Sequence, residues 1–143
     1  MASSLILNVG STAPTTTNKF ITVAGILVAG NNQANSQLVL RLAGKMKDMY
    51  TYVSANTTLN ATTISFQKGG ADTTLDVSYN AAQTGIKEDT TANITMAAGD
   101  LINYAISYNL AEVATLTLVV AAIEFVPTVS TTCVQIVAAR GPL

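Results

Sequence analysis

Short runs of alternating apolar and polar residues, separated by turn-forming sequences, recur along the chain. The clearest run is residues 62–68, where Ile64 and Phe66 alternate with polar residues. Residues 69–72 read Gly-Gly-Ala-Asp, which has the composition of a hairpin turn, and residues 73–79 form a second alternating run. Because successive side chains of a strand point to opposite faces, this pattern predicts a β-hairpin with one buried face.

The rest of the chain divides in a similar way. Further strands are predicted at residues 4–8, 20–29, 37–42, 93–96, 101–108, 114–126 and 131–139. Turn and loop composition is found at residues 10–18, 30–35, 80–91 and 97–100. About ten short antiparallel strands with turn signals between them describe an all-β sandwich or barrel.

One segment permits two interpretations. Residues 46–54 alternate, with Met46, Asp48, Tyr50 and Tyr52 on one face, and neither face is cleanly apolar. The alternative is a helix over residues 38–49, where apolar residues also recur at helical spacing. The strand-rich flanks favour a strand.

The composition points to contacts with other protein. The chain has 143 residues, enough for one domain, and 49% of them are hydrophobic. Only 10% are charged, against about 25% in an average globular protein. The net charge of -1 gives no electrostatic footprint for nucleic acid or an anionic membrane. We therefore expect much of the surface to be covered by protein partners.

The residue types present exclude most familiar catalytic chemistry. Histidine is absent and Cys133 is the single cysteine, which excludes Ser-His-Asp and Cys-His systems, His-based zinc sites and disulfides within the chain. Cys133 itself is expected to be a small buried hydrophobe. No acidic segment has the spacing of a calcium loop. The sequence therefore predicts no enzyme activity, no cofactor and no metal site.

Targeting signals are also missing from the sequence pattern. The N-terminus has no basic region followed by a long apolar stretch, and the longest apolar run, residues 118–123, is too short for a membrane helix. We expect synthesis in the cytoplasm without export, and no membrane partner.

Three segments resemble the jelly-roll heads of the tumour-necrosis-factor and complement globular-head superfamily, in particular its phage and bacterial members. They are Ile-Ser-Phe-Gln-Lys-Gly-Gly at residues 64–70, Asn-Ile-Thr-Met-Ala-Ala-Gly-Asp-Leu-Ile at residues 93–102, and Ala-Ala-Ile-Glu-Phe at residues 121–125. The match covers less than half of the chain. Gly69 stands where the family usually has Asn, and the chain continues beyond the point where such heads normally end.

The resemblance implies an all-β jelly-roll sandwich that forms a homotrimer around an apolar three-fold axis. Small trimers of this kind are similar to phage capsid decoration (cement) proteins. The implied function is therefore a structural virion protein that is made in the host cytoplasm, binds the major capsid protein on the capsid surface and stabilises the assembled head. The expected organisation is an N-terminal arm and linker at residues 1–19, a jelly-roll domain at residues 20–126 and a C-terminal extension at residues 127–143. The alternative for the first segment is an ordinary first strand followed by a loop.

Two groups of residues are candidates for contacts between chains. The trimer interface is predicted to include Tyr50, Tyr52, Tyr104 and Phe125, because aromatic side chains contribute large buried areas; the alternative is that they fill the core of one subunit. Contact with the capsid or a neighbour is predicted for apolar residues near the two ends, namely Leu5, Ile6, Leu7, Val134, Ile136 and Val137.

Two other functions stay open. The first is a receptor- or glycan-binding tip of a phage tail fibre or adhesin, although the predicted loops lack aromatic residues. The second is a small shell subunit that assembles by itself.

Overall fold

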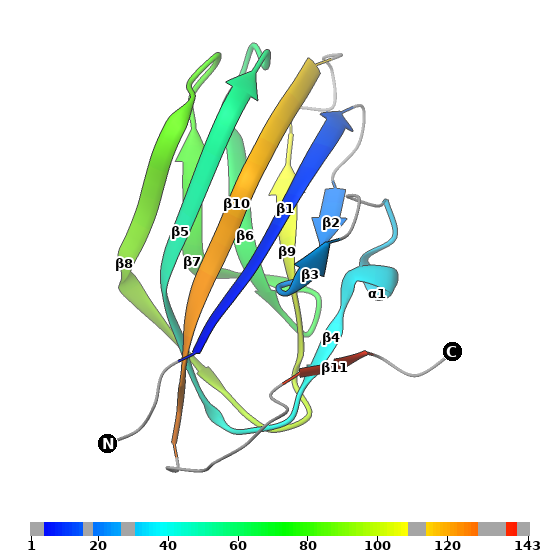
Figure 1. Cartoon of the computed structure of the whole chain (residues 1–143), viewed down its shortest axis with the longest axis vertical. Coiled ribbons are helices and arrows are strands. Elements are labelled where there is room, and N and C mark those ends of the chain that lie inside the picture. Colours follow the sequence, from blue (N-terminus) through cyan, green and yellow to red (C-terminus); the bar gives the residue numbers. More distant parts are fainter. Residues whose placement is uncertain (1–4, 16–18, 27–30, 109–113, 129–136, 140–143) are drawn as a thin grey trace.

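The structure, a computed structural model, describes residues 5–15, 19–26, 31–108, 114–128 and 137–139. In this part of the chain strands are the dominant regular structure and there is almost no helix, and Figure 1 shows two sheets that face each other. The first, sheet A, has the strand order β3 (Gly25–Ile26), β1 (Leu5–Thr15), β10 (Ala114–Pro127), β5 (Gly44–Asn56) and β8 (Gly85–Met96).

The second sheet, sheet B, has six strands. Its order is β11 (Val137–Ala139), β4 (Leu38–Leu40), β9 (Leu101–Ser107), β6 (Thr62–Lys68) and β7 (Ala71–Tyr79), and β2 (Lys19–Ile21) also pairs with β9. One short helix, α1 (Gln33–Ser36), precedes β4. All described strand pairs are antiparallel except the short β1·β3 pair. The prediction of an all-β chain of antiparallel strands is confirmed.

Eight of the strands pair in a nested order. The β6–β7 hairpin is the innermost pair, and β5·β8, β4·β9 and β1·β10 follow outward from it. The chain therefore runs toward the hairpin through one half of these strands and returns through the other half. Successive pairs alternate between the two sheets, so the nested pairing itself places the two sheets face to face.

The hydrophobic core lies between the sheets, because each strand turns alternate side chains inward. Sheet A contributes Met46, Met49, Val53, Leu116, Leu118, Ala121, Ile123 and Phe125. Sheet B contributes Ile64, Phe66, Leu75, Val77, Tyr79, Ile102, Tyr104 and Ile106. The rings of Phe66 and Tyr104 meet edge to face, with centroids 6.3 Å apart.

A polar network fixes α1 against the outer face of sheet B. Asn103 of β9 is fully buried, and its Nδ2 donates to Gln67 Oε1 at 2.8 Å and to Ser36 Oγ at 3.3 Å. Gln33 Nε2 donates to the same Gln67 oxygen at 2.7 Å and to the carbonyl oxygen of Gly70 at 2.8 Å. Amide groups thus hold a polar segment that the sequence predicted as a loop.

Two strands extend into segments that were predicted as loops. β8 begins at Gly85, although residues 80–91 have loop composition, and Lys87 and Glu88 lie within it. Its exposure alternates along its length, as expected for a strand at the edge of a sheet, where charged residues are tolerated. β1 runs through Thr15, so the linker predicted from residue 10 onward is wrong as far as Thr15.

The predicted N-terminal arm therefore contains a strand of sheet A. β1 pairs with β10 from Leu5 to Thr15, and β3 pairs with it at Val9 and Gly10. In contrast, the predicted strands at residues 20–29 and 37–42 are interrupted or shorter where the structure describes them. Residues 20–26 contain the end of β2 and the two residues of β3, and β4 takes up three of residues 37–42. Residues 27–29 lie outside the described residues.

A β-bulge in β5 reverses which alternate side chains point into the core. Its pairing shifts between Lys47 and Met49 on the β8 side, and Asp48 has the positive φ of 51°. The extra residue reverses the alternation, so Met46 is buried whereas Tyr52 is exposed, although the sequence placed them on one face. The helix considered for residues 38–49 is wrong, because β4 and β5 occupy most of this range.

Candidate functional site

The outer face of sheet A carries three of the four large apolar side chains that are exposed among the described residues; the fourth, Leu59, lies in the loop between β5 and β6. Tyr52 of β5 is the register partner of Ile86 on β8 and of Val120 on β10. The exposed fractions are 38% for Tyr52, 60% for Ile86 and 43% for Val119, beside Val120. We call Tyr52, Ile86, Val119 and Val120 the outer patch. Because directly opposed side chains on a sheet are neighbours, the outer patch is contiguous across three strands.

Tyr50 extends this surface along β5. It is half-buried and lies opposite Ala122 on β10 and Glu88 on β8. Two of the four aromatic residues predicted for an interface, Tyr50 and Tyr52, thus have surface exposure on one face of one sheet.

The other two predicted interface residues lie elsewhere. Tyr104 and Phe125 have no exposed surface and are part of the core between the sheets. A side chain enclosed by its own subunit cannot contact another chain at a trimer axis. The prediction is corrected for these two residues, which serve the alternative role of filling the sandwich.

The apolar residues near the two ends of the chain are placed only in part. Leu5, Ile6 and Leu7 belong to β1 and are the register partners of Phe125, Glu124 and Ile123. Val137 begins β11 and is paired with Leu40. Val134 and Ile136, like Cys133, lie outside the described residues. Contact of these segments with a capsid or a neighbour stays a prediction.

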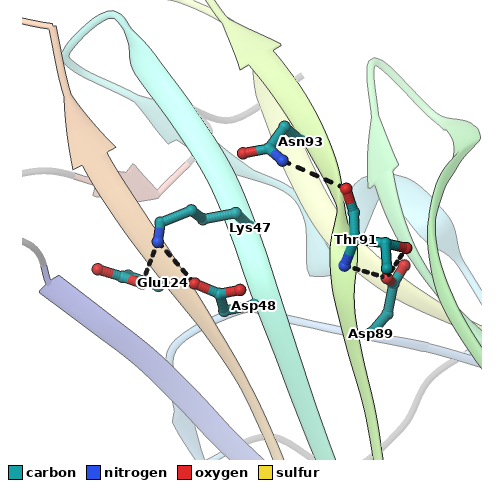
Figure 2. Close-up of polar contacts among 6 residues, drawn as sticks. All are labelled: Lys47, Asp48, Asp89, Thr91, Asn93 and Glu124. Carbon is teal, nitrogen blue, oxygen red and sulfur yellow. Dashed lines mark hydrogen bonds and ion pairs between the residues drawn. The ribbon is translucent and has the colours of Figure 1, made fainter.

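A charged cluster lies on the same sheet, where Lys47 of β5 meets Glu124 of β10 (Figure 2). Lys47 Nζ is 2.6 Å from Asp48 Oδ2 and 3.0 Å from Glu124 Oε2, the latter on the neighbouring strand β10. The hydrogen bond to Asp48 and that to Glu124 raise the pKa of Lys47, and the same contact with Lys47 lowers the pKa of Asp48. At neutral pH the lysine stays protonated, so it is a poor nucleophile or base.

A third carboxylate in this region, that of Asp89, stabilises the backbone of β8. Asp89 Oδ1 accepts hydrogen bonds from the backbone N–H of Thr91 at 2.9 Å, from its hydroxyl at 2.9 Å and from the N–H of Ala92 at 3.2 Å. Burial acts to raise the pKa of Asp89, but the hydrogen bonds outweigh it and the pKa is lowered. These hydrogen bonds provide acceptors for the N–H groups of Thr91 and Ala92, which lie where the pairing of β8 with β5 shifts at Asp48.

In residues 5–15, 19–26, 31–108, 114–128 and 137–139, no group of three or more acidic or cysteine side chains is placed to hold a metal ion. No helix in the same ranges has the length and hydropathy needed to cross a membrane.

Sequence reasoning missed Ile86 and Val119 as surface residues. Ile86 falls in a segment that reads as a loop, and its signal was an isolated large apolar residue next to three charged ones. The Lys47–Glu124 pair was also missed, because its two residues are far apart in the chain and only strand register brings them together. No protein-family model matches the chain, and no curated protein matches it.

Proposed function

We propose that this chain is a structural virion protein, a homotrimer that decorates an assembled phage capsid and stabilises it. The proposal includes a jelly-roll topology for the sandwich, the major capsid protein as partner and the capsid surface as location. Its mechanism is mechanical: the trimer bridges neighbouring capsid subunits and adds buried area to the lattice.

The nested pairing supports the jelly-roll part of the proposal. When β1, β4, β5, β6, β7, β8, β9 and β10 are numbered one to eight, sheet A reads 1-8-3-6 and sheet B reads 2-7-4-5. This order results when the two halves of the chain run antiparallel to each other and the four strand pairs that they form wrap around a common core. A jelly roll built from two Greek keys is expected to have this order, so the pairing supports that topology.

The positions of the three family-like segments agree with the same topology. Residues 64–70 span most of β6 and the turn that follows, and residues 121–125 lie in β10. Residues 93–102 include the turn between β8 and β9, where Gly99 has a φ of 96° and Ala97 N–H donates to Asp100 Oδ2 at 2.7 Å. A glycine therefore stands where the turn needs a left-handed conformation.

The outer patch is the observation that carries the trimer. It lies on a sheet face, is apolar, includes Tyr52 and adjoins Tyr50, as expected for a surface covered by another copy. The ion-pair cluster of Lys47, Asp48 and Glu124 lies farther along the same two strands, β5 and β10. The low charge of the whole chain is consistent with this use.

Stabilisation of a shell follows from selective binding. A protein that binds the assembled lattice but not the dispersed subunits shifts the equilibrium toward the lattice by mass action. The first test is the native mass of the purified protein by light scattering, at micromolar and then nanomolar concentration. A species of three chains supports the proposal, and a monomer at both concentrations contradicts the trimer.

The second test addresses the shell. Phage heads with and without this protein are heated and transferred to low salt, and the release of their DNA is measured. Earlier release from heads that lack the protein is expected, whereas equal resistance would contradict the stabilising role. Assembly of the purified protein into large particles would instead favour a small shell subunit.

A receptor- or glycan-binding tip is the second candidate. One observation favours it: the outer side of β7 exposes Asp72, Thr74 and Ser78, whose polar groups suit hydrogen bonds to sugars. Binding on a glycan array that is lost in the Asp72→Ala variant would support this function. An array without hits would count against it.

A further inference from the structure

The edge of sheet A at β1 is only partly paired. β1 is hydrogen-bonded along its whole length to β10 on one side. On its other side, the described part of the chain pairs with it only through β3, at Val9 and Gly10. Within the described residues, the backbone of Leu5–Asn8 therefore has a free edge of alternating N–H and C=O groups. Such an edge is a template for another strand.

The sequence does not protect this edge. Natural sheets prevent pairing at an edge with charged residues, especially lysine, or with proline. The residues from Leu5 to Asn8 contain neither. On the opposite side of the sandwich, β7 carries Asp72 and Asp76, and β8 carries Lys87, Glu88 and Asp89. In the part of the chain that the structure describes, charged residues thus lie along the edges at one side of the sandwich, whereas Leu5–Asn8 has none.

We infer that the Leu5–Asn8 edge is a self-association site, at which a second copy of this chain adds its own β1 antiparallel to the first. Identical strands related by a two-fold axis run antiparallel, so each copy supplies the donors and acceptors that the other needs. β3 occupies the edge at Val9 and limits the ladder to these four residues of each strand.

A two-fold contact here also involves the second sheet. Figure 1 shows β11 on the same side of the molecule as β3, at the corresponding edge of sheet B. The three residues of β11, Val-Ala-Ala, are uncharged. Side-by-side copies therefore bring the uncharged Leu5–Asn8 and β11 segments of the two chains to the same side, whereas the charged side formed by β7 and β8 stays outside the contact. A second copy is favoured over a foreign strand because one symmetric contact covers both edges.

This inference does not depend on the proposed trimer. The trimer was assigned to the outer face of sheet A, and the two-fold contact uses the side of the sandwich. Both contacts can therefore exist in one assembly, as pairs of trimers or as a net of trimers on a surface.

Hydrogen exchange provides the direct test. In the wild-type protein, those amides of Leu5–Asn8 that point away from β10 should exchange at least about tenfold more slowly at high than at low concentration, because a partner strand then covers them. The Ile6→Lys variant should abolish that difference and weaken the two-fold association by at least about tenfold. The matched control is Thr74→Lys, an exposed position on the already charged β7 edge, which should change neither measurement.

Three results would overturn the inference. Exchange of Leu5–Asn8 that is independent of concentration would show that no second copy covers the edge, and this wild-type measurement stands even if Ile6→Lys does not fold. Protection that arises only after addition of capsids would assign the edge to a foreign strand. Even-numbered association that survives in Ile6→Lys would place the two-fold contact elsewhere. If Ile6→Lys loses the even-numbered species but still forms the trimer, the inference is supported. If neither the wild type nor Ile6→Lys forms a trimer, only the proposed function is contradicted.

Discussion

The hydroxyl groups of Tyr79 and Thr51 lie 2.8 Å apart in the interior and join the two sheets. Tyr79 belongs to β7 of sheet B, and Thr51 belongs to β5 of sheet A. The Tyr79 hydroxyl also lies 3.1 Å from the carbonyl oxygen of Gly85, at the start of β8. One buried phenol thus connects three strands, and Lys87 Nζ lies 5.7 Å from the centre of its ring.

Removal of this hydroxyl should weaken the fold. In Tyr79→Phe, Thr51 loses a buried hydrogen-bond partner while the packing volume is kept, so the free energy of unfolding should fall by about 1–3 kcal/mol. Urea unfolding followed by circular dichroism measures the change. An unchanged midpoint would show that the contact between the sheets contributes nothing net.

Tyr104 is a second buried tyrosine, but in the described part of the chain its hydroxyl lacks the hydrogen bonds that the Tyr79 hydroxyl makes, so the same substitution should have the opposite effect. Its ring is fully buried, and its hydroxyl has no hydrogen-bond partner among the described residues, so burial raises its pKa. Tyr104→Phe removes a polar group that is buried without compensation, and we expect stability to stay equal or to rise by about 1 kcal/mol. The same urea experiment compares both variants. If Tyr104→Phe lowered the free energy of unfolding as much as Tyr79→Phe does, the Tyr104 hydroxyl would have a hydrogen-bond partner.

Gly44 is required where β5 passes β10 closely. A Cβ atom at this position would lie 2.4 Å from the carbonyl oxygen of Val126 and 2.6 Å from Phe125 Cε2. Gly44→Ala should therefore destabilise the fold by about 1–3 kcal/mol or more, because both neighbours belong to a packed strand. The exposed Ser54→Ala on the same strand is the control, with an expected change within about 0.5 kcal/mol.

Asp76 should make stability depend on pH. Partial burial raises its pKa, and the carboxylates of Asp89 and Asp72 raise it further. The folded state then holds this proton more tightly than the unfolded chain, so ionisation of Asp76 lowers stability above the folded pKa. Asp76→Asn should be more stable than the wild type at neutral pH. That difference should shrink and vanish as the pH falls below the ordinary pKa of an aspartate.

Thermal unfolding of both proteins across this pH range measures the difference. Thr74→Asn, at an exposed position of the same strand, is the control and should differ from the wild type by a constant amount. A difference between Asp76→Asn and the wild type that does not depend on pH would contradict the assignment.

The outer patch can be tested without disturbing the core. Ile86 is 60% exposed, so Ile86→Lys should leave the fold intact. If another copy covers the patch, a buried lysine should weaken the trimer by at least about tenfold, visible as a lower native mass at nanomolar concentration. Thr95→Lys, exposed on the same strand, is the control. A trimer of unchanged strength in Ile86→Lys would place the interface on another surface.

The strands that were predicted correctly are those whose residue pattern depends only on neighbours along the chain. The hairpin of β6 and β7 was predicted from a regular alternation and a turn of two glycines, Gly69 and Gly70, both with positive φ. β8 was predicted only from residue 93, because the charged residues before it resemble a loop. Their place at a sheet edge, where one side of the backbone stays open, is a property of the whole sheet.

The candidate site was predictable to a smaller extent. Tyr50 and Tyr52 were selected as aromatic residues in an alternating strand, and they do have surface exposure. Tyr104 and Phe125 belong to equally regular runs, yet both lie in the core. Alternation shows that a strand has two faces but does not say which face meets the second sheet. A single bulge at Asp48 is enough to reverse the assignment.

By itself, the sequence determined the strand-forming character of this protein, its principal turns and the absence of histidine chemistry, because these depend on side-chain identity and on neighbours along the chain. The tertiary structure decided which strands pair, which face of each is buried, and which residues distant in sequence, such as Lys47 and Glu124, meet. Register across sheets depends on contacts between distant segments, and local residue patterns do not encode it.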